Sequence, residues 1–97
     1  MARSLLRTDD TFSFMITDSQ WKAFLEYARS RLQTDEEFFV SPETLAEACS
    51  FQVPFWEQLE ARWRPERPSD FDYRGQHQTI SGEPSMIHFW RTPEFNG

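Results

Sequence analysis

Few residue types in this chain could carry out catalysis or bind a metal ion. The sequence contains two histidines, His77 and His88, and a single cysteine, Cys49. Neither histidine has a cysteine or a second histidine at the short spacing that metal ligands usually show. A phosphate-binding loop needs closely spaced glycines, and the three glycines of this chain are scattered. The sequence therefore predicts a protein without catalytic residues, metal site or cofactor.

Carboxylates are plentiful, and they are concentrated in one part of the chain. The formal net charge is −6, and no lysine or arginine lies between Leu32 and Ala61. The acidic residues of that window outweigh the whole net charge, so the rest of the chain is close to neutral. A catalytic carboxyl pair needs two opposed environments, which a sequence does not show. We therefore interpret these carboxylates as a surface that attracts a basic partner. They are Asp35, Glu36, Glu37, Glu43, Glu47, Glu57 and Glu60.

Composition indicates one domain in a reducing compartment. The 97 residues suffice for one core, and a 16% aromatic content supplies large rings to fill it. A single cysteine excludes an internal disulfide framework, which favours the cytoplasm. The sequence has no apolar run long enough to cross a bilayer and no secretory signal pattern, so we expect no membrane association.

The stretch from Ser41 to Trp63 is predicted to form two short helices joined by a tight turn. Ser41 is suited to cap the first helix, and Pro42 suits its first position because the missing N–H costs nothing there. Residues 50–52 form the turn. The apolar residues then recur at helical spacing and predict one buried face on each helix. These residues are Leu45, Ala46, Cys49, Trp56, Leu59 and Trp63.

This stretch resembles the helix-turn-helix family position by position. The family has an apolar residue, a small residue directly after it, and further apolar residues at fixed spacing, and this chain matches with Leu45, Ala46, Cys49, Phe51, Trp56 and Leu59. Two helices that cross at a wide angle need a small residue at the closest approach and an apolar plug from the turn. Ser50 departs from the pattern, because the family usually has glycine there to allow a positive φ.

The remaining segments are predicted from their patterns. Thr17 and Gln20 have the spacing of a capping box, and the apolar residues that follow indicate a helix from Thr17 to about Gln33. Alternation of apolar and small residues predicts a strand at residues 12–16, and a short apolar run that stops at Ser41-Pro42 predicts another at 38–40. Pro65 and Pro68 lie in a predicted linker. The further expectations are a flexible segment at 1–11, a helical part at 17–63, a linker at 64–75, a hairpin at 76–91 and a tail at 92–97.

In order, these elements match a winged helix with an added first strand. The resemblance implies a small α+β domain with three helices, a C-terminal β-hairpin and an extra N-terminal strand. A generic α+β domain is the competing interpretation.

For most helix-turn-helix proteins the resemblance implies DNA binding, with the second helix in the major groove. Gln52 and Gln58 could then contact base edges, and arginines from the helix end and hairpin could contact phosphates. However, Glu57 would point a negative charge at the DNA. The DNA-binding residues of this alternative, a transcriptional regulator, are Gln52, Gln58, Arg62, Arg64, Arg67 and Arg74.

A non-catalytic protein-binding module is the hypothesis that the acidity favours. If Trp56 and Leu59 face the core, Phe55 is expected to face outward and anchor an interface, with Glu57 and Glu60 attracting a basic partner. The partner could be a nucleic-acid-binding complex or a second copy of the chain. The candidate residues are Glu43, Glu47, Val53, Phe55, Glu57, Gln58 and Glu60.

In bulk properties the chain is similar to small acidic inhibitors encoded by phages, among them anti-CRISPR proteins and nucleic-acid mimics. Such inhibitors occupy the basic nucleic-acid channels of host machines. The similarity concerns size, acidity and the lack of enzymatic motifs, and it extends the protein-binding hypothesis to this class of partner.

Overall fold

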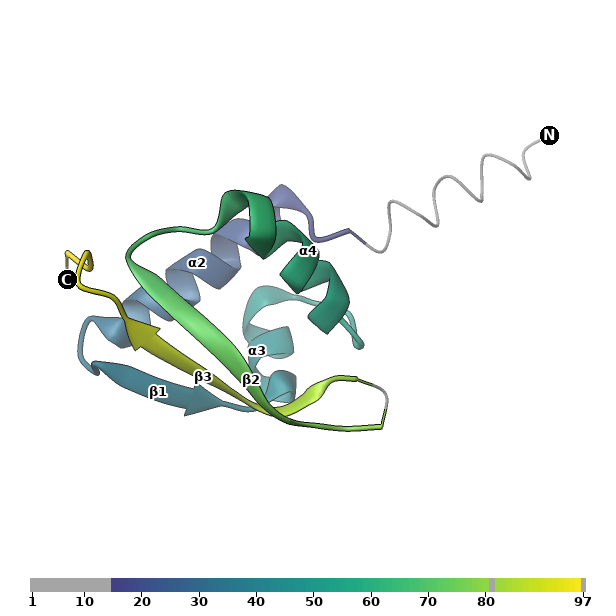
Figure 1. Ribbon diagram of the computed structural model, residues 1–97. Coiled ribbons are helices and arrows are strands. Elements are labelled where there is room, and N and C mark those ends of the chain that lie inside the picture. The colour runs from purple at the N-terminus through teal and green to yellow at the C-terminus, as the bar shows by residue number, and fades with distance from the viewer. Residues whose placement is uncertain (1–14, 81, 97) are drawn as a thin grey trace.

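The computed structural model describes residues 15–80 and 82–96, and this part of the chain forms a small α+β domain, as predicted (Figure 1). The helices lie against one face of an antiparallel sheet and leave the other face uncovered (Figure 1). The elements, in chain order, are α2 (Asp18–Leu32), β1 (Glu37–Val40), α3 (Pro42–Cys49), α4 (Trp56–Glu66), β2 (Phe71–Gln78) and β3 (Pro84–Arg91).

The sheet has three strands in the order β1-β3-β2, so the last strand lies in the middle. Phe38 of β1 and Tyr73 of β2 both lie opposite Phe89 of β3. Because side chains alternate along a strand, this register gives the sheet one apolar face and one mixed face. The residues of the apolar face are buried under the helices: Phe38, Val40, Phe71, Tyr73, Ile87 and Phe89.

Phe24 of α2 lies at the centre of the core and is fully buried. Its ring meets Tyr73 and Trp63 edge-on, at centroid distances of 5.7 and 6.1 Å. Both geometries are among those that aromatic pairs favour, because the positive ring edge meets the negative face. The same ring therefore links α2 to α4 and to the sheet. Its other ring neighbours are Trp21, Phe51, Phe71 and Phe89.

The predicted starts of the first two helices are confirmed, whereas the turn predicted at 50–52 extends to Phe55, because α4 begins only at Trp56. The Thr17 side chain accepts from the backbone of Gln20 and the Gln20 side chain accepts from the backbone of Thr17, which is a complete capping box. The Ser41 side chain accepts from the backbone N–H of Thr44, and Pro42 begins α3. Ser50, the residue where glycine is usual in the helix-turn-helix pattern, adopts the left-handed conformation with φ 60°. The turn therefore forms despite the strain that a side chain adds there.

The prediction that Phe55 faces outward is wrong. Phe55 is only 1% exposed, and its ring packs against Phe51 at 4.8 Å. The reason is that α4 begins at Trp56, so Phe55 is the residue before the helix and does not follow the helical period. Trp56 is half-buried instead, and it lies edge-on to the Tyr73 ring.

The predicted linker at 64–75 is too long at both ends. α4 continues through Pro65 to Glu66, because a proline near the end of a helix removes only one hydrogen bond. Arg67 then has an extended ψ of 125°, as expected of a residue that precedes a proline. β2 begins at Phe71, so the hairpin starts earlier than residue 76.

The predicted first strand, at 12–16, lies mostly outside the described residues. Within them, Met15 forms a bend and Ile16 is buried against the core, and neither belongs to a strand. In the tail, the backbone N–H of Thr92 donates to Asp70 at 3.1 Å, and the Arg91 guanidinium lies 5.1 Å from the centre of the Phe95 ring. These two contacts place the start of the tail beside β2.

Gly75 allows β2 to pass under Trp56. A Cβ atom at this position would lie 2.9 Å from the Trp56 ring and 2.9 Å from the side chain of Pro84. Any larger residue would therefore have to displace the indole, the proline or the strand.

We expect the substitution Phe55→Ala to destabilise the fold by about 3–5 kcal/mol, because it removes a fully buried aromatic ring and leaves a cavity. Urea unfolding followed by tryptophan fluorescence measures the change. Val53→Ala is the matched control in the same turn, where Val53 is 69% exposed. The control should change the free energy of unfolding by less than about 0.5 kcal/mol. An unchanged unfolding midpoint for Phe55→Ala would instead mean that this ring faces solvent.

Candidate protein-interaction surface

Of the three side chains that could do chemistry, Cys49 is buried and His88 is paired, whereas His77 is exposed near the end of β2, apart from both. Cys49 is 1% exposed, and burial raises the pKa of its thiol to about 12, so the thiol stays protonated at neutral pH. The His88 ring nitrogen Nε2 lies 2.7 Å from the Glu37 carboxylate. Among residues 15–80 and 82–96, no group of His, Cys, Asp or Glu could hold a metal ion. Nor is any helix in this part of the chain long and apolar enough to cross a membrane.

Four of the predicted partner-binding residues are accessible to solvent. Glu43 and Glu47 lie on the outer side of α3, Glu57 lies in the first turn of α4, and Val53 lies in the preceding turn. None of the three carboxylates forms an ion pair with another described residue. They are therefore free to attract a cationic partner.

The other three predicted partner-binding residues have roles within the fold. Phe55 belongs to the core, as described above. Glu60 is half-buried, and its carboxylate accepts a hydrogen bond of 3.0 Å from the hydroxyl of Tyr73. Burial and the neighbouring Glu60 raise the Tyr73 pKa, so the hydroxyl remains a donor. Gln58 folds back on its own helix start, where the amide nitrogen, with the amide group turned over to suit its neighbours, donates to the backbone oxygens of Pro54 and Phe55 at 3.2 and 2.9 Å.

The arginines of the DNA-binding alternative are only partly available. The guanidinium of Arg62 donates to Asp18 at 2.8 Å, to Glu66 at 3.0 Å and to the backbone oxygen of Ile16 at 3.0 Å. It thereby joins α4 to the start of α2. Arg67 pairs with Asp72 at 3.4 Å.

Arg64 and Arg74 are exposed and pair with no carboxylate in the described part of the chain, but they lie on different elements, α4 and β2. Gln52 is also exposed, in the turn before α4. Of the residues predicted to contact DNA, Gln52, Arg64 and Arg74 are thus the ones that remain available.

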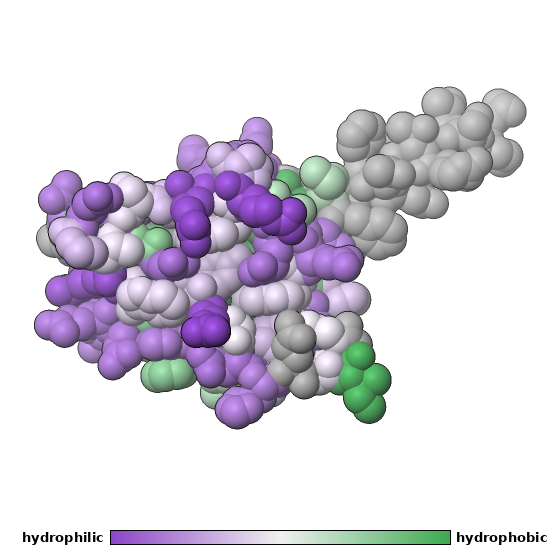
Figure 2. Space-filling view, in the orientation of Figure 1, coloured by the Kyte–Doolittle hydropathy of each residue, from purple (hydrophilic) through white to green (hydrophobic). Residues whose placement is uncertain are grey.

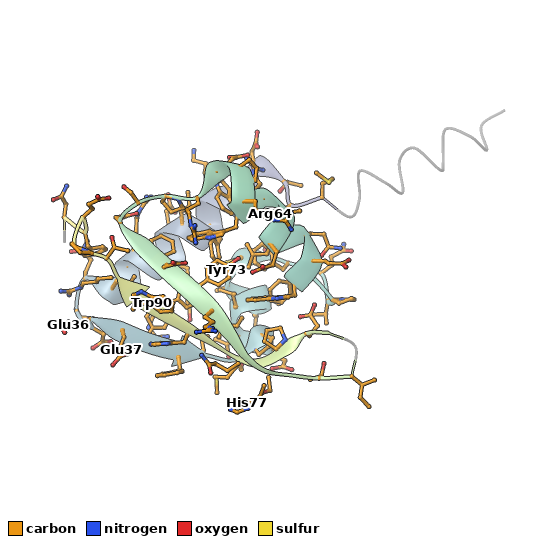
Figure 3. All side chains as sticks on the ribbon, viewed as in Figure 1. Glu36, Glu37, Arg64, Tyr73, His77 and Trp90 are labelled. Carbon is orange, nitrogen blue, oxygen red and sulfur yellow. The ribbon has the colours of Figure 1, made fainter. Side chains whose placement is uncertain are left out.

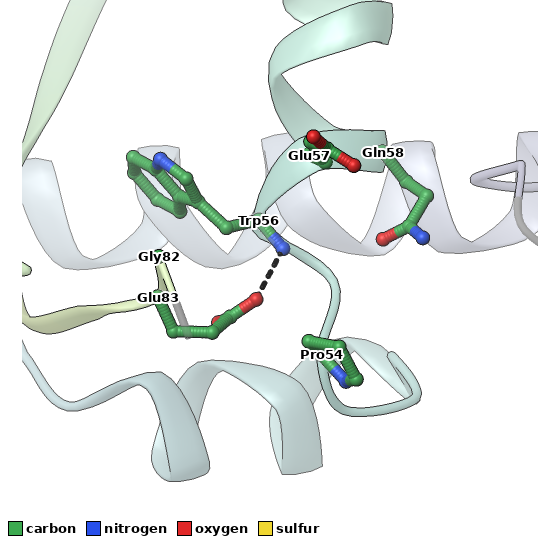
Figure 4. A pocket seen from close by; sticks show the side chains of 6 residues that line it. All are labelled: Pro54, Trp56, Glu57, Gln58, Gly82 and Glu83. Carbon is green, nitrogen blue, oxygen red and sulfur yellow. Dashed lines mark hydrogen bonds between the residues drawn. The ribbon is translucent and has the colours of Figure 1, made fainter. Parts of the chain in front are cut away.

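The start of α4 is capped by a residue from the distant hairpin. Phe55, directly before the helix, offers no side-chain cap, and the Glu83 carboxylate takes that place. One Glu83 oxygen accepts from the backbone N–H groups of Phe55 and Trp56 at 2.9 and 2.8 Å (Figure 4). A carboxylate at this position also interacts favourably with the positive end of the helix dipole. The contact therefore fixes the hairpin turn against α4.

A small pocket surrounds this contact and brings two turns together. It is lined by side chains from the turn before α4, from the first turn of α4 and from the β2–β3 turn: Pro54, Trp56, Glu57, Gln58, Gly82 and Glu83 (Figure 4). The second Glu83 oxygen is buried in the structure without a hydrogen-bond partner among the described residues.

Exposed apolar side chains occur on both of these turns. Val53 is 69% exposed, and Ile80, in the β2–β3 turn, is fully exposed. The two turns lie at the same end of the molecule (Figure 1). We call Val53, Pro54, Glu57 and Ile80 the tip surface. Sequence reasoning missed Ile80, although an apolar residue next to a turn at Gly82 was the available signal.

The substitution Glu83→Ala should cost about 1–2 kcal/mol of stability, because it removes both the acceptor and the negative charge at the start of α4. Glu83→Gln should recover part of the loss, since the amide oxygen can still accept. Glu57→Ala is the control, because Glu57 is an acidic residue in the first turn of α4 that caps no N–H group. Thermal unfolding of the three variants measures these changes in stability. Equal losses of stability for Glu57→Ala and Glu83→Ala would contradict a specific cap.

Comparison with known proteins assigns no family to this chain. No protein-family model, curated protein or solved structure matches it.

Proposed function

We propose that this chain is a non-catalytic protein-binding module that binds a partner with a basic surface. The observation that carries the proposal is the combination of unpaired carboxylates on α3 and α4 with exposed apolar side chains on the turn before α4 and on the β2–β3 turn. Glu43, Glu47 and Glu57 supply the charge, and Val53 and Ile80 supply the apolar contacts. Interfaces of this kind combine apolar anchors with charges that steer the encounter.

We further propose that the domain is a winged helix. The order of elements supports this assignment, with a helix, a short strand, two helices and a hairpin. The antiparallel strand order β1-β3-β2 supports it as well, because β1, which precedes α3 and α4, pairs with β3, the second strand of the hairpin. In this assignment the β2–β3 turn is the tip of the wing, and Glu83 holds it against α4.

DNA binding is the less favoured function on electrostatic grounds. Affinity for DNA depends on several cations that release counterions from phosphates. Arg62 and Arg67 are held by carboxylates of the chain itself, and the outer side of α4 presents Glu57. The side chain of Gln58 is likewise occupied within its own helix. These features leave α4 without a cluster of free donors for a major groove.

The class of partner that we propose is a nucleic-acid-binding protein complex with a basic channel. A chain with a net charge of −6 competes with nucleic acid for such a channel. An inhibitor of the kind encoded by phages would act in this way, and a second copy of this chain is the other candidate partner.

We expect no binding to a random-sequence DNA duplex at micromolar protein and low salt, where any attraction to phosphates is strongest. Fluorescence anisotropy of labelled DNA measures this. Salt-sensitive binding that is lost in Arg64→Ala or Arg74→Ala would instead make the chain a DNA-binding regulator and overturn the proposal.

The tip surface is tested by affinity capture from host lysate. We expect a captured partner to be lost when Val53→Ser and Ile80→Ser are combined, because both apolar anchors are removed. Met86→Ser is the control, since Met86 is 37% exposed but lies on the sheet, away from the tip surface. In a second assay, the wild-type chain should displace labelled nucleic acid that is bound to the captured partner. Equal capture by all variants would exclude the tip surface as the binding site.

A further inference from the structure

The uncovered face of the sheet carries an ordered arrangement of aromatic and charged side chains. These residues alternate with the buried ones, so they point away from the helices. In one row across the strands, Trp90 of β3 lies between Glu37 of β1 and Asp72 of β2. In the next row, His88 lies between Phe39 and Arg74. Directly opposed side chains in such rows lie close enough to act on one ligand.

The aromatic members of this face form a continuous surface. The Phe39 and His88 rings are stacked at a centroid distance of 4.3 Å with an interplanar angle of 6°. Trp90 continues this group, at 4.9 Å from His88. Phe39 is 54% exposed although it is a large apolar residue. A face of this kind is normally covered in a folded protein or used for binding.

A shallow hollow lies at the Trp90 end of this face, with carboxylates along its rim. Its lining includes Glu36, Glu37, His88, Trp90 and Arg91. Glu36, Glu37 and Trp90 lie close together at this end of the sheet (Figure 3). In the view of the same face in Figure 2, the surface around this end is largely hydrophilic.

The single cation in the lining of the hollow does not neutralise these carboxylates. Arg91 directs its guanidinium to the end of α2, where it donates to the backbone oxygens of Leu32 and Gln33 at 2.7 and 3.3 Å. Glu36 forms no ion pair with any described residue. The Glu37 carboxylate lies 2.7 Å from the His88 ring nitrogen Nε2, so Glu36 is the carboxylate of the hollow that no described cation pairs. The hollow therefore combines a half-buried indole with one unpaired carboxylate.

We propose that this face docks an arginine side chain from an extended basic segment of a protein partner, with the guanidinium over Trp90 and between Glu37 and Asp72. Tryptophan is the aromatic residue that binds cations best. A guanidinium can stack flat on the indole while its edges donate to carboxylates on either side, which an ammonium group cannot do equally well. The charge of the hollow is complementary to such a segment.

Single-stranded nucleic acid is the occupant that these observations disfavour. Aromatic residues on a sheet can also stack with bases, but such platforms lie in positively charged surroundings. Here Glu36, Glu37 and Asp72 surround Trp90, and Asp72 already engages Arg67. Only Arg74 offers a free cation on this face of the described sheet.

This inference goes beyond the proposed function, because none of these residues belongs to the tip surface. A variant of the sheet face is therefore expected to retain capture through Val53 and Ile80. Failure of one surface is distinguishable from failure of the other.

The experiment uses the full chain and a short labelled peptide of alternating arginine and glycine, and binding is followed by fluorescence anisotropy at about 0.15 M salt, where the Debye length is about 8 Å. We expect Trp90→Leu, and the double variant Glu36→Gln with Glu37→Gln, each to weaken binding about tenfold. The matched control is Asp18→Asn with Glu26→Gln, which removes the same charge from exposed positions of α2, on the other side of the sheet. It should weaken binding by less than about twofold, because exposed charges at a distance are screened.

Three results would overturn the proposal. Equal weakening by the two double variants would reduce the interaction to general attraction between a basic peptide and an acidic protein. Unchanged binding in the double variant of Glu36 and Glu37 would exclude these carboxylates from the binding site. Circular dichroism is used to check that each variant is folded. Tighter binding of an oligouridine RNA than of the peptide, lost in Trp90→Leu, would assign the face to single-stranded nucleic acid.

Discussion

Packing of aromatic rings around Phe24 is the interaction on which the rest of this structure depends. The chain is short, and its sheet buries only one face, so the core needs side chains that fill a large volume each. Phe24 reaches Trp63 of α4 and Phe71, Tyr73 and Phe89 of the sheet from a single position on α2. The two layers are thus held together by ring contacts.

Because ring contacts hold the layers together, most surface charges are free for recognition. The exceptions are ion pairs that join one element of the fold to another. Arg29 on α2 binds Asp70 with two hydrogen bonds of 2.7 and 3.1 Å and lowers the pKa of that carboxyl. Arg62 joins α4 to the start of α2. Several basic residues therefore join elements to each other, whereas the carboxylates of α3 and of the β1 edge are mostly unpaired. The unpaired carboxylates of α3 and Glu36 are consequently available to a cationic partner.

Local sequence signals are sufficient to predict the starts of α2 and α3 and the β3 strand. Thr17 with Gln20, and Ser41 with Pro42, are short-range patterns whose partners lie within one turn. The errors arose where a local rule was applied beyond its range. The helical period does not apply to Phe55, because it precedes α4. Of the two prolines in the predicted linker, Pro65 does not end the helix, because it removes only one hydrogen bond near the helix end. β2 was shortened because its outward residues, such as Asp72 and Arg74, resemble a polar linker, while Phe71 and Tyr73 carried the alternation.

The candidate sites depend on contacts between distant segments, which explains why the sequence revealed only their parts. Alternation alone placed His88 and Trp90 on the same face of the last strand. That Trp90 lies between Glu37 and Asp72 follows from strand order and register, which are set by how the helices cover the sheet. The cap that Glu83 supplies to α4 likewise joins residues far apart in the chain. Because this cap holds the β2–β3 turn beside Val53 and Pro54, it forms the tip surface, so the stability of α4 and the shape of that surface are linked through one carboxylate.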